Sequence, residues 1–287
     1  MLLSMTGFGK AVAHLPNKKI TVEIRTLNSK GLDLNLRIPS VYREKESIIR
    51  QMAAQGIQRG KADLAIYVEW IGVAGSPQIN MELVKWYYNE LKPVADDLGA
   101  QSDLLSSILR MPEVVKSERE ELNEKEWLVL EKAISEAVVH LNEFRAEEGK
   151  HLKVEFEKRV GEILKNLEHC LQYESARVDE IKARLQAAID QMDVQPDKNR
   201  LEQELIFYFE KLDVTEEKVR LSKHCDYFLE TMNEKESQGR KLGFITQEMG
   251  REINTLGSKS NHAEMQKAVV GMKDELEKIK EQVLNIL

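Results

Sequence analysis

The chain has 287 residues and a formal net charge of −7, with 42% apolar and 32% charged residues. This is enough sequence for one large domain or two modest ones with a sizeable core, and the high charge with only 15 Gly and 6 Pro favours long solvated helices over disorder. Cys170 and Cys225 lie too far apart in sequence for a zinc or disulfide motif, which favours a reducing cytoplasm. No signal-peptide pattern and no membrane-length apolar run occurs, so we expect neither secretion nor membrane insertion.

The charge is unevenly distributed along the chain. Residues 1–70 carry a local charge of +5, and the remainder carries −12. Opposite signs indicate different tasks, because the first part attracts anions that the second part repels.

The first part of the sequence predicts a mixed sheet with one helix. Apolar and polar residues alternate over 20–25, 32–38 and 62–70, which is the period of half-buried strands, and a first strand is expected near residues 4–14. Ser40 is expected to cap a helix that runs to about Gln55, before Gly56. The order of elements is therefore β-β-β-α-β.

The polar face of this sheet has two interpretations. Arg25 and Arg37 are expected as cross-strand neighbours, with Lys30 in the turn between their strands and basic residues, Arg59 and Lys61, entering the last strand. The face is either a phosphate-binding patch or an ordinary solvated surface on which Glu23 and Asp33 are ion-pair partners. No aromatic RNA-binding motif of the sheet-stacking kind is found.

From about residue 80 onward the sequence predicts helices. Asn80 is expected to cap a helix that Pro93 and Gly99 interrupt, and Pro112 to end a short segment. A long charged stretch from about residue 117 to 192 predicts long antiparallel helical arms. The fold class is thus α+β, with an N-terminal mixed domain and helical extension over 1–155 and a helical C-terminal domain over 156–287.

The final helix carries an uninterrupted heptad seam, which requires a partner in another arm of the same chain or in another subunit. The seam consists of Met265, Val269, Met272, Leu276, Ile279, Val283 and Ile286.

The residues best suited to catalysis or metal binding lie in two predicted helices near the C-terminus. In the segment 239–261 an apolar stripe stands opposite a polar wedge, where Glu248 and Glu252 lie one turn apart and can address one cation or water. In the preceding helix, for which Thr215 is the expected cap, Glu217 and His224 fall in an apolar seam and are expected to point inward.

These groups allow a structural and a functional interpretation. The structural one is a satisfied His–Glu contact between helices. The functional one is a divalent-metal or general-base site, with Arg220, Arg251 and Lys259 close enough to neutralise a developing phosphoryl charge. A single histidine disfavours a metal-free scheme that needs two imidazoles, so metal assistance is the preferred hypothesis.

Several motifs are similar to those of the YicC/YloC family from end to end. The first set is Ser4-Met5-Thr6-Gly7-Phe8-Gly9, Val22-Glu23-Ile24-Arg25, Asn28, Leu32-Asp33, Arg37-Ile38-Pro39 and Arg59-Gly60-Lys61. The second set is Glu216-Glu217, Arg220-Leu221, His224, Gln247-Glu248-Met249, Arg251-Glu252, Asn254-Thr255-Leu256, Ser258-Lys259-Ser260-Asn261 and Glu281-Gln282-Val283. Arg145, Glu148 and Gly149 also resemble family residues. The family usually has Asn or Asp before Arg251 and Asp after Leu242, where this chain has Gly250 and Gly243.

The resemblance implies an endoribonuclease of bacterial RNA turnover, assembled as a homohexamer in the cytoplasm and assisted by Mg²⁺ or Mn²⁺. RNA is the expected partner, with no DNA and no membrane. The implied catalytic residues are Glu217, Arg220, His224, Glu248, Arg251, Glu252 and Lys259, of which His224, Glu248 and Glu252 are the expected metal ligands. The implied RNA contacts are Arg25, Asn28, Lys30, Arg37, Arg59 and Lys61.

Two rival hypotheses remain. The chain is either a noncatalytic oligomeric adaptor that delivers RNA to a separate ribonuclease, or a structural coiled-coil protein without RNA affinity. Phe244 projects from the polar side of its helix and either stacks on a base or fills a subunit contact.

Overall fold

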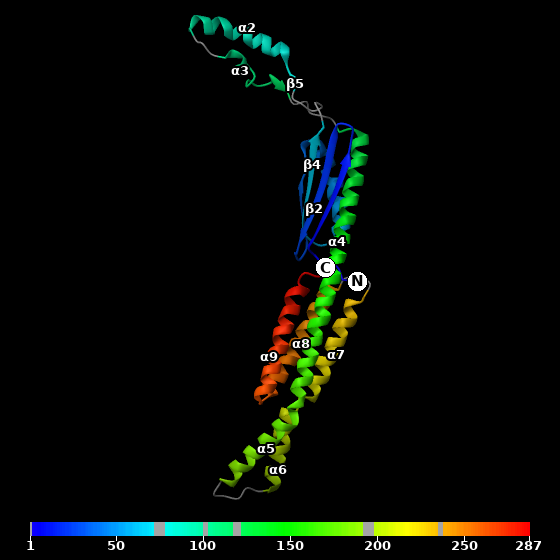
Figure 1. Ribbon diagram of the computed structural model, residues 1–287, viewed down its shortest axis with the longest axis vertical. Helices are drawn as coiled ribbons and strands as arrows, with labels where there is room; N and C mark the ends of the chain where they lie inside the picture. Colours follow the sequence, from blue (N-terminus) through cyan, green and yellow to red (C-terminus); the bar gives the residue numbers. More distant parts are fainter. Residues whose placement is uncertain (1, 72–77, 100–102, 117–121, 192–197, 235–237) are drawn as a thin grey trace.

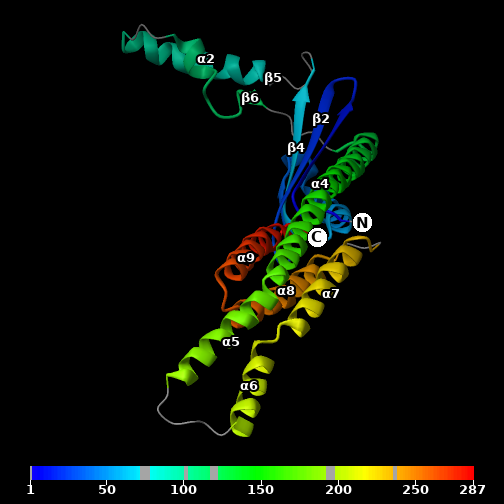
Figure 2. The same ribbon diagram turned by 60° about the horizontal axis from the view of Figure 1, so that its bottom comes forward.

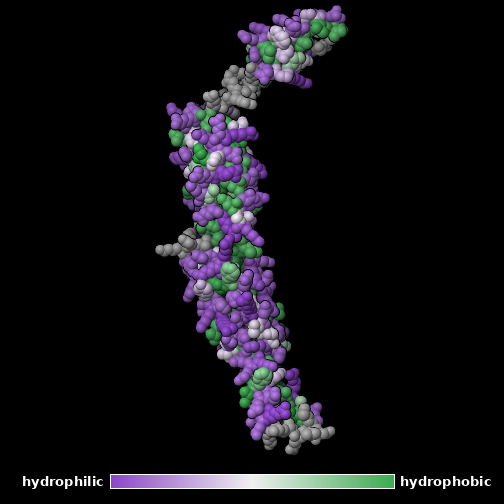
Figure 3. Space-filling model, turned by 180° about the vertical axis from the view of Figure 1, so that it is seen from behind, coloured by the Kyte–Doolittle hydropathy of each residue, from purple (hydrophilic) through white to green (hydrophobic). Residues whose placement is uncertain are grey.

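The protein is an elongated α+β molecule, as the sequence predicts. The computed structural model describes residues 2–71, 78–99, 103–116, 122–191, 198–234 and 238–287. A four-stranded sheet lies above a helical bundle, a small unit projects beyond the sheet, and a pair of helices extends below the bundle (Figure 1). On the face seen in Figure 3 the surface of the body is predominantly hydrophilic.

The sheet contains the four predicted strands in an order that the sequence did not indicate. These strands are β1 (Gly7–His14), β2 (Lys18–Leu27), β3 (Leu32–Arg37) and β4 (Gly60–Trp70), arranged as β1-β2-β4-β3. The helix between β3 and β4 makes a crossover that leaves these two strands parallel, and β4 enters between β2 and β3. The prediction that Arg25 and Arg37 are cross-strand neighbours is therefore wrong, since Arg25 lies opposite Asp63 and Arg37 opposite Ala65.

One face of the sheet is covered by helices, so that the other stays open. The covering elements are η1 (Ser40–Lys45), α1 (Glu46–Ile57) and the N-terminal half of α4 (Glu124–Gln172). The helical segment begins at Ser40 as predicted, but Ser40 makes no side-chain capping bond, and α1 ends at Ile57, so the predicted end before Gly56 is wrong. Gly56 is needed for packing on α4 because a Cβ there would lie 2.2 Å from Val138 Cγ1.

Helix α4 joins the two halves of the molecule. Its 49 residues span about 74 Å, and the side chain of Asn123 caps its first turn. Its first half packs in the sheet core with Leu130 and Leu141, and its second half in the helical core with Phe156 and Leu167. The proposed domain boundary at residue 155 falls inside this continuous helix and stays a prediction.

The C-terminal part is a helical bundle around the second half of α4. It contains α5 (Glu174–Asp190), α6 (Lys198–Leu212), α7 (Thr215–Met232), α8 (Gly239–Lys259) and α9 (Ala263–Val283). Helices α7 and α9 pack against α4, and α8 packs against α7 and α9, whereas α5 and α6 extend away from the bundle (Figure 2). The heptad seam of α9 is buried against α4 and α8, so its partner belongs to the same chain.

The projecting unit has a small core of its own. It contains β5 (Gln78–Ile79), α2 (Met81–Asp97), α3 (Leu104–Ile108) and β6 (Val115–Lys116). Asn80 caps α2 by accepting a bond from the Leu83 amide, as predicted. Pro93 lies inside α2 rather than breaking it, and Gly99, with a φ of +63°, follows the helix end.

The two ends of the chain meet where the sheet joins the bundle. The Met5 amide donates to the Asn285 carbonyl at 2.7 Å, and the Leu287 amide to the Leu3 carbonyl at 2.9 Å. Buried Arg145 donates to the carbonyls of Met5 and two residues before β4, and its burial lowers the pKa of the guanidinium to about 10. None of the described helices is both long and apolar enough to cross a membrane.

Candidate RNA-binding and catalytic sites

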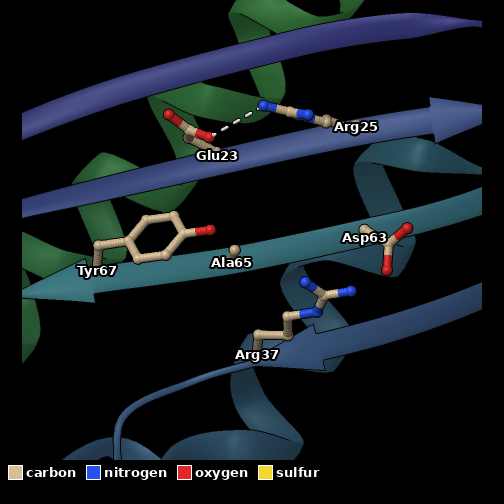
Figure 4. A pocket seen from close by; sticks show the side chains of 6 residues that line it. All are labelled: Glu23, Arg25, Arg37, Asp63, Ala65 and Tyr67. Carbon is tan, nitrogen blue, oxygen red and sulfur yellow. Dashed lines mark ion pairs between the residues drawn. The ribbon is translucent and has the colours of Figure 1, made fainter.

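The open face of the sheet contains a hollow of about 200 Å³. It is lined by Glu23, Arg25, Arg37, Asp63, Ala65 and Tyr67 (Figure 4). The small side chain of Ala65 forms its floor, because every neighbouring outward position on the three strands carries a longer side chain. The β4 insertion that separates Arg25 from Arg37 in the strand order thus places both arginines at the rim of one depression.

The charges around this hollow are mixed. Glu23 pairs with Lys10 at 3.0 Å and with Arg25 at 3.6 Å, and Asp63 accepts a bond from Asn35 at 2.7 Å. Arg37 makes no ion pair within the described part of the chain, and its guanidinium points toward Ala65 and Asp63 (Figure 4). The predicted Glu23 ion pair of a solvated face is therefore present, and the face also retains a free guanidinium that can meet a phosphate.

Of the other predicted RNA contacts, two side chains are exposed and two make hydrogen bonds within the fold. Lys61 is exposed on the same face as the arginines, and Lys30 is exposed in the turn between β2 and β3. Asn28 instead donates to the Leu284 carbonyl at 2.6 Å, which links the sheet to the end of the chain. Arg59 donates to the Ser29 carbonyl at 3.1 Å, so its guanidinium holds the β2–β3 turn.

Two aromatic residues on the open face were missed by the sequence interpretation. Phe8 is 37% exposed and Tyr67 is 50% exposed, and the guanidinium carbon of Arg25 lies 5.5 Å from the Phe8 ring centroid. The available signal was the Gly7-Phe8-Gly9 motif. A Cβ on Gly9 would lie 2.1 Å from the carbonyl oxygen of Ala137, so both glycines must face α4 and Phe8 must face outward.

The second candidate site lies at the end of the antiparallel α7–α8 pair. Glu217 is buried as predicted, and its Oε1 lies 2.8 Å from Lys259 Nζ, which also donates to the Asp213 carbonyl at 2.8 Å. Glu217 Oε2 is buried and has no hydrogen-bond partner among the described residues. The pair therefore offers one carboxylate oxygen that remains available for a proton or a ligand.

Arg177 holds the backbone on both sides of this ion pair. Its guanidinium, in the first turn of α5, donates to the carbonyls of Leu212 and Lys259 at 2.9 and 2.8 Å. No sequence pattern indicated this role, because Arg177 is 35 and 82 residues away along the chain from Leu212 and Lys259. Thr215 begins α7 but does not cap it. Its hydroxyl and amide instead donate to Asp213, which lowers the pKa of that carboxyl below its ordinary value.

The three predicted metal ligands do not form a cluster. Glu248 is turned to Arg251, three residues along α8, at 2.7 Å, and His224 is half-buried without a hydrogen bond to any described residue. No group of three His, Cys, Asp or Glu side chains in the described ranges is arranged to hold a metal ion. The described part of the single chain thus does not bring His224, Glu248 and Glu252 together, and their role as metal ligands stays a prediction.

The remaining predicted residues lie on the exposed side of the helix pair. Arg220 pairs with Glu216 on α7, and Arg251 is also largely exposed. Phe244 is 67% exposed on α8, so its two proposed roles, base stacking and subunit contact, both remain open. Two separate arginines are therefore accessible to an anion near the α7–α8 pair.

The fold and these two polar regions define a two-part α+β protein, in which one long helix joins a half-covered sheet to a helical bundle. The chain belongs to the YicC-like endoribonuclease family. "Endoribonuclease YicC-like, N-terminal region" matches residues 2–154, and "Endoribonuclease YicC-like, C-terminal" matches residues 168–287. The family resemblance of the sequence motifs is thereby confirmed.

Two curated relatives match over their full lengths. The chain is 34% identical to "Probable endoribonuclease YicC" of Clostridioides difficile (strain 630), with 100% of each chain covered. It is 28% identical to "Probable endoribonuclease YicC" of Haemophilus influenzae, again with 100% of each chain covered.

Proposed function

We propose that this protein is an endoribonuclease that cleaves RNA internally. The observation that carries the proposal is the match of both parts of the chain to the YicC-like endoribonuclease family and to full-length relatives named "Probable endoribonuclease YicC". The structure supports it with two complementary regions. An open sheet face carries exposed cationic side chains for an RNA backbone, and a helix pair carries a buried carboxylate beside an ammonium group.

The proposed chemistry assigns different tasks to the groups of α7 and α8. Glu217, with one unpartnered oxygen, and His224 are the candidate general acid and base, because one imidazole cannot serve as acid and base at once and needs a second group for the opposite proton transfer. Lys259, Arg220 and Arg251 would stabilise the charge that develops on the phosphoryl oxygens. Glu248 and Glu252, on the polar side of α8, are the remaining proposed catalytic residues.

A divalent ion, Mg²⁺ or Mn²⁺, is part of the proposal as a requirement for cleavage. The described residues of one chain do not present a ready set of ligands, so we assign no step to the ion. We further propose a homohexamer, in which a second copy is one source of additional ligands, acting in cytoplasmic RNA turnover. We expect RNA, rather than DNA or a membrane, to be the partner.

The test is an internal-cleavage assay with the purified full chain. An unstructured RNA labelled at one end is incubated with Mg²⁺ or Mn²⁺, with and without EDTA, and the fragments are separated by size. We expect internal fragments that EDTA suppresses. RNA that stays intact under all conditions would contradict the proposal.

The adaptor is the second candidate function. It is favoured by the lack of a preassembled acid cluster among the described residues, together with the exposed arginines of the sheet. An adaptor would bind the same RNA without cutting it. A purely structural protein would show no RNA affinity, whereas affinity that falls steeply with salt indicates phosphate contacts.

A further inference from the structure

The open sheet face combines the two kinds of side chain that single-stranded RNA requires. Arg25, Arg37 and Lys61 supply positive charge, and Phe8 and Tyr67 supply exposed aromatic rings. In proteins that bind single strands, cations follow the phosphates while bases stack on aromatic side chains. A base-paired duplex cannot use such rings, because its bases are already stacked on one another.

We propose that this face binds single-stranded RNA by stacking bases on Phe8 and Tyr67, with the phosphates held by Arg25 and Arg37. The inference rests on the proposed function in one respect, that RNA is the ligand, and adds the strandedness of the substrate and the residues that select it. It also explains why Phe8 stays outside a fold whose neighbouring residues are packed against α4.

The positions of the two rings set the binding geometry. Phe8 lies opposite Arg25, which lies opposite Asp63, and Tyr67 is four residues further along β4. With a rise of about 3.3 Å per residue and about 4.8 Å between strands, the Cα atoms of Phe8 and Tyr67 lie about 16 Å apart. One base cannot bridge that distance, so each ring stacks on a different base.

The hollow above Ala65 fits between these two stacking points. Its volume of about 200 Å³ lies beside the Tyr67 ring, and its rim carries donors on Arg25 and Arg37 and acceptors on Glu23 and Asp63 (Figure 4). A nucleobase edge presents both donors and acceptors, so a rim of mixed polarity suits a base better than a phosphate alone. The carboxylates of Glu23 and Asp63 would repel a phosphate, but they can accept hydrogen bonds from the donors of a base edge in the same site.

Ring removal and charge removal have different consequences for salt dependence. Phe8→Leu and Tyr67→Leu should each weaken binding of single-stranded RNA about five- to one-hundred-fold, with an unchanged slope of log affinity against log salt concentration. Phe8→Tyr and Tyr67→Phe keep the rings and should bind as the wild type does. Arg25→Gln and Arg37→Gln should each reduce the slope by about 0.7, because each removes one phosphate contact.

The experiment measures fluorescence anisotropy of the full chain with a labelled unstructured RNA, and with the same RNA annealed to its complement. EDTA is present, and intact RNA is confirmed afterwards. Trp86→Leu, which removes a 56% exposed aromatic residue from the projecting helix α2, is the matched control and should bind normally. Circular dichroism confirms that each variant is folded.

The outcomes separate this inference from the proposed function. A wild type that prefers the single strand, together with weaker binding by both leucine variants, supports stacking. Leucine variants that bind as tightly as the wild type, or a duplex that binds as well as the single strand, would overturn it while RNA binding and cleavage by the wild type still stand. A wild type without RNA affinity would overturn both.

Discussion

Replacing Lys259 by methionine should destabilise the helical bundle, because it leaves the Glu217 carboxylate buried without its cation. The two charged atoms are 2.8 Å apart, and the side chains of Glu217 and Lys259 are only 8% and 26% exposed. Breaking a fully buried pair by removing one partner costs about 3–5 kcal/mol. Since Lys259 is partly solvated, we expect a loss of about 2–3 kcal/mol in the free energy of unfolding.

The matched control is Arg251→Met on the same helix. Arg251 and Glu248 are also close, at 2.7 Å, but their side chains are 72% and 41% exposed, so solvent screens the charge that is left behind. Urea unfolding followed by circular dichroism should therefore show a lower midpoint for Lys259→Met and little change for Arg251→Met. Adding Glu217→Gln to Lys259→Met should restore part of the loss. Equal stability of the two single variants would refute a buried, paired Glu217.

Three further predictions concern other parts of the fold. The bonds from Thr215 hold the pKa of Asp213 below its ordinary value of 3.8. The contribution of Asp213 to stability is therefore present above pH 3.8 and is lost as the pH falls through the lower pKa of the folded state. Asp213→Asn should reduce this loss of stability in acid, measured by unfolding at a series of pH values. Burial raises the pKa of Cys225 to about 12, so a thiol reagent should label it at pH 8 only after the protein unfolds, and rapid labelling of the folded chain would contradict that burial. Gly9→Ala should lower stability by about 1–3 kcal/mol, because its Cβ would lie 2.1 Å from a carbonyl oxygen of α4, whereas Gly31→Ala, with open space around it, should unfold as the wild type does.

Local patterns were sufficient to predict most of the secondary structure. Alternation located β2, β3 and β4, and the heptad spacing identified the buried side of α9, because each pattern reflects a face that must leave water. The errors concerned single residues whose role depends on distant packing. Pro93 continues α2, and Gly56 remains inside α1 because α4 lies directly against it.

Tertiary features had weaker signals in the sequence. The insertion of β4 between β2 and β3 depends on the crossover, and it determines which side chains share the hollow above Ala65. The meeting of the chain ends and the role of Arg177 join residues far apart in sequence, which periodicity cannot reveal. The prediction that Glu217 points inward is confirmed, because the residue lies on an apolar helical face.

The described part of the single chain does not bring the three predicted metal ligands together, and their role stays a prediction. One-turn spacing placed Glu248 and Glu252 on one face, but it could not indicate that Arg251 would attract Glu248 at 2.7 Å. Ion pairing within a helix competes with ligand convergence between helices.

Cleavage and binding by a Glu248→Ala/Glu252→Ala variant test the proposed endoribonuclease most directly. The wild type, this variant and a control with two exposed acidic residues of α9 removed, Asp274→Ala/Glu277→Ala, are compared for internal cutting of labelled RNA and for RNA affinity. We expect cutting by the wild type and the control, and intact RNA with unchanged affinity for the Glu248→Ala/Glu252→Ala variant. Full cleavage by that variant would exclude these carboxylates from the reaction. A wild type that binds RNA but never cuts it would contradict the proposal that the protein is an endoribonuclease.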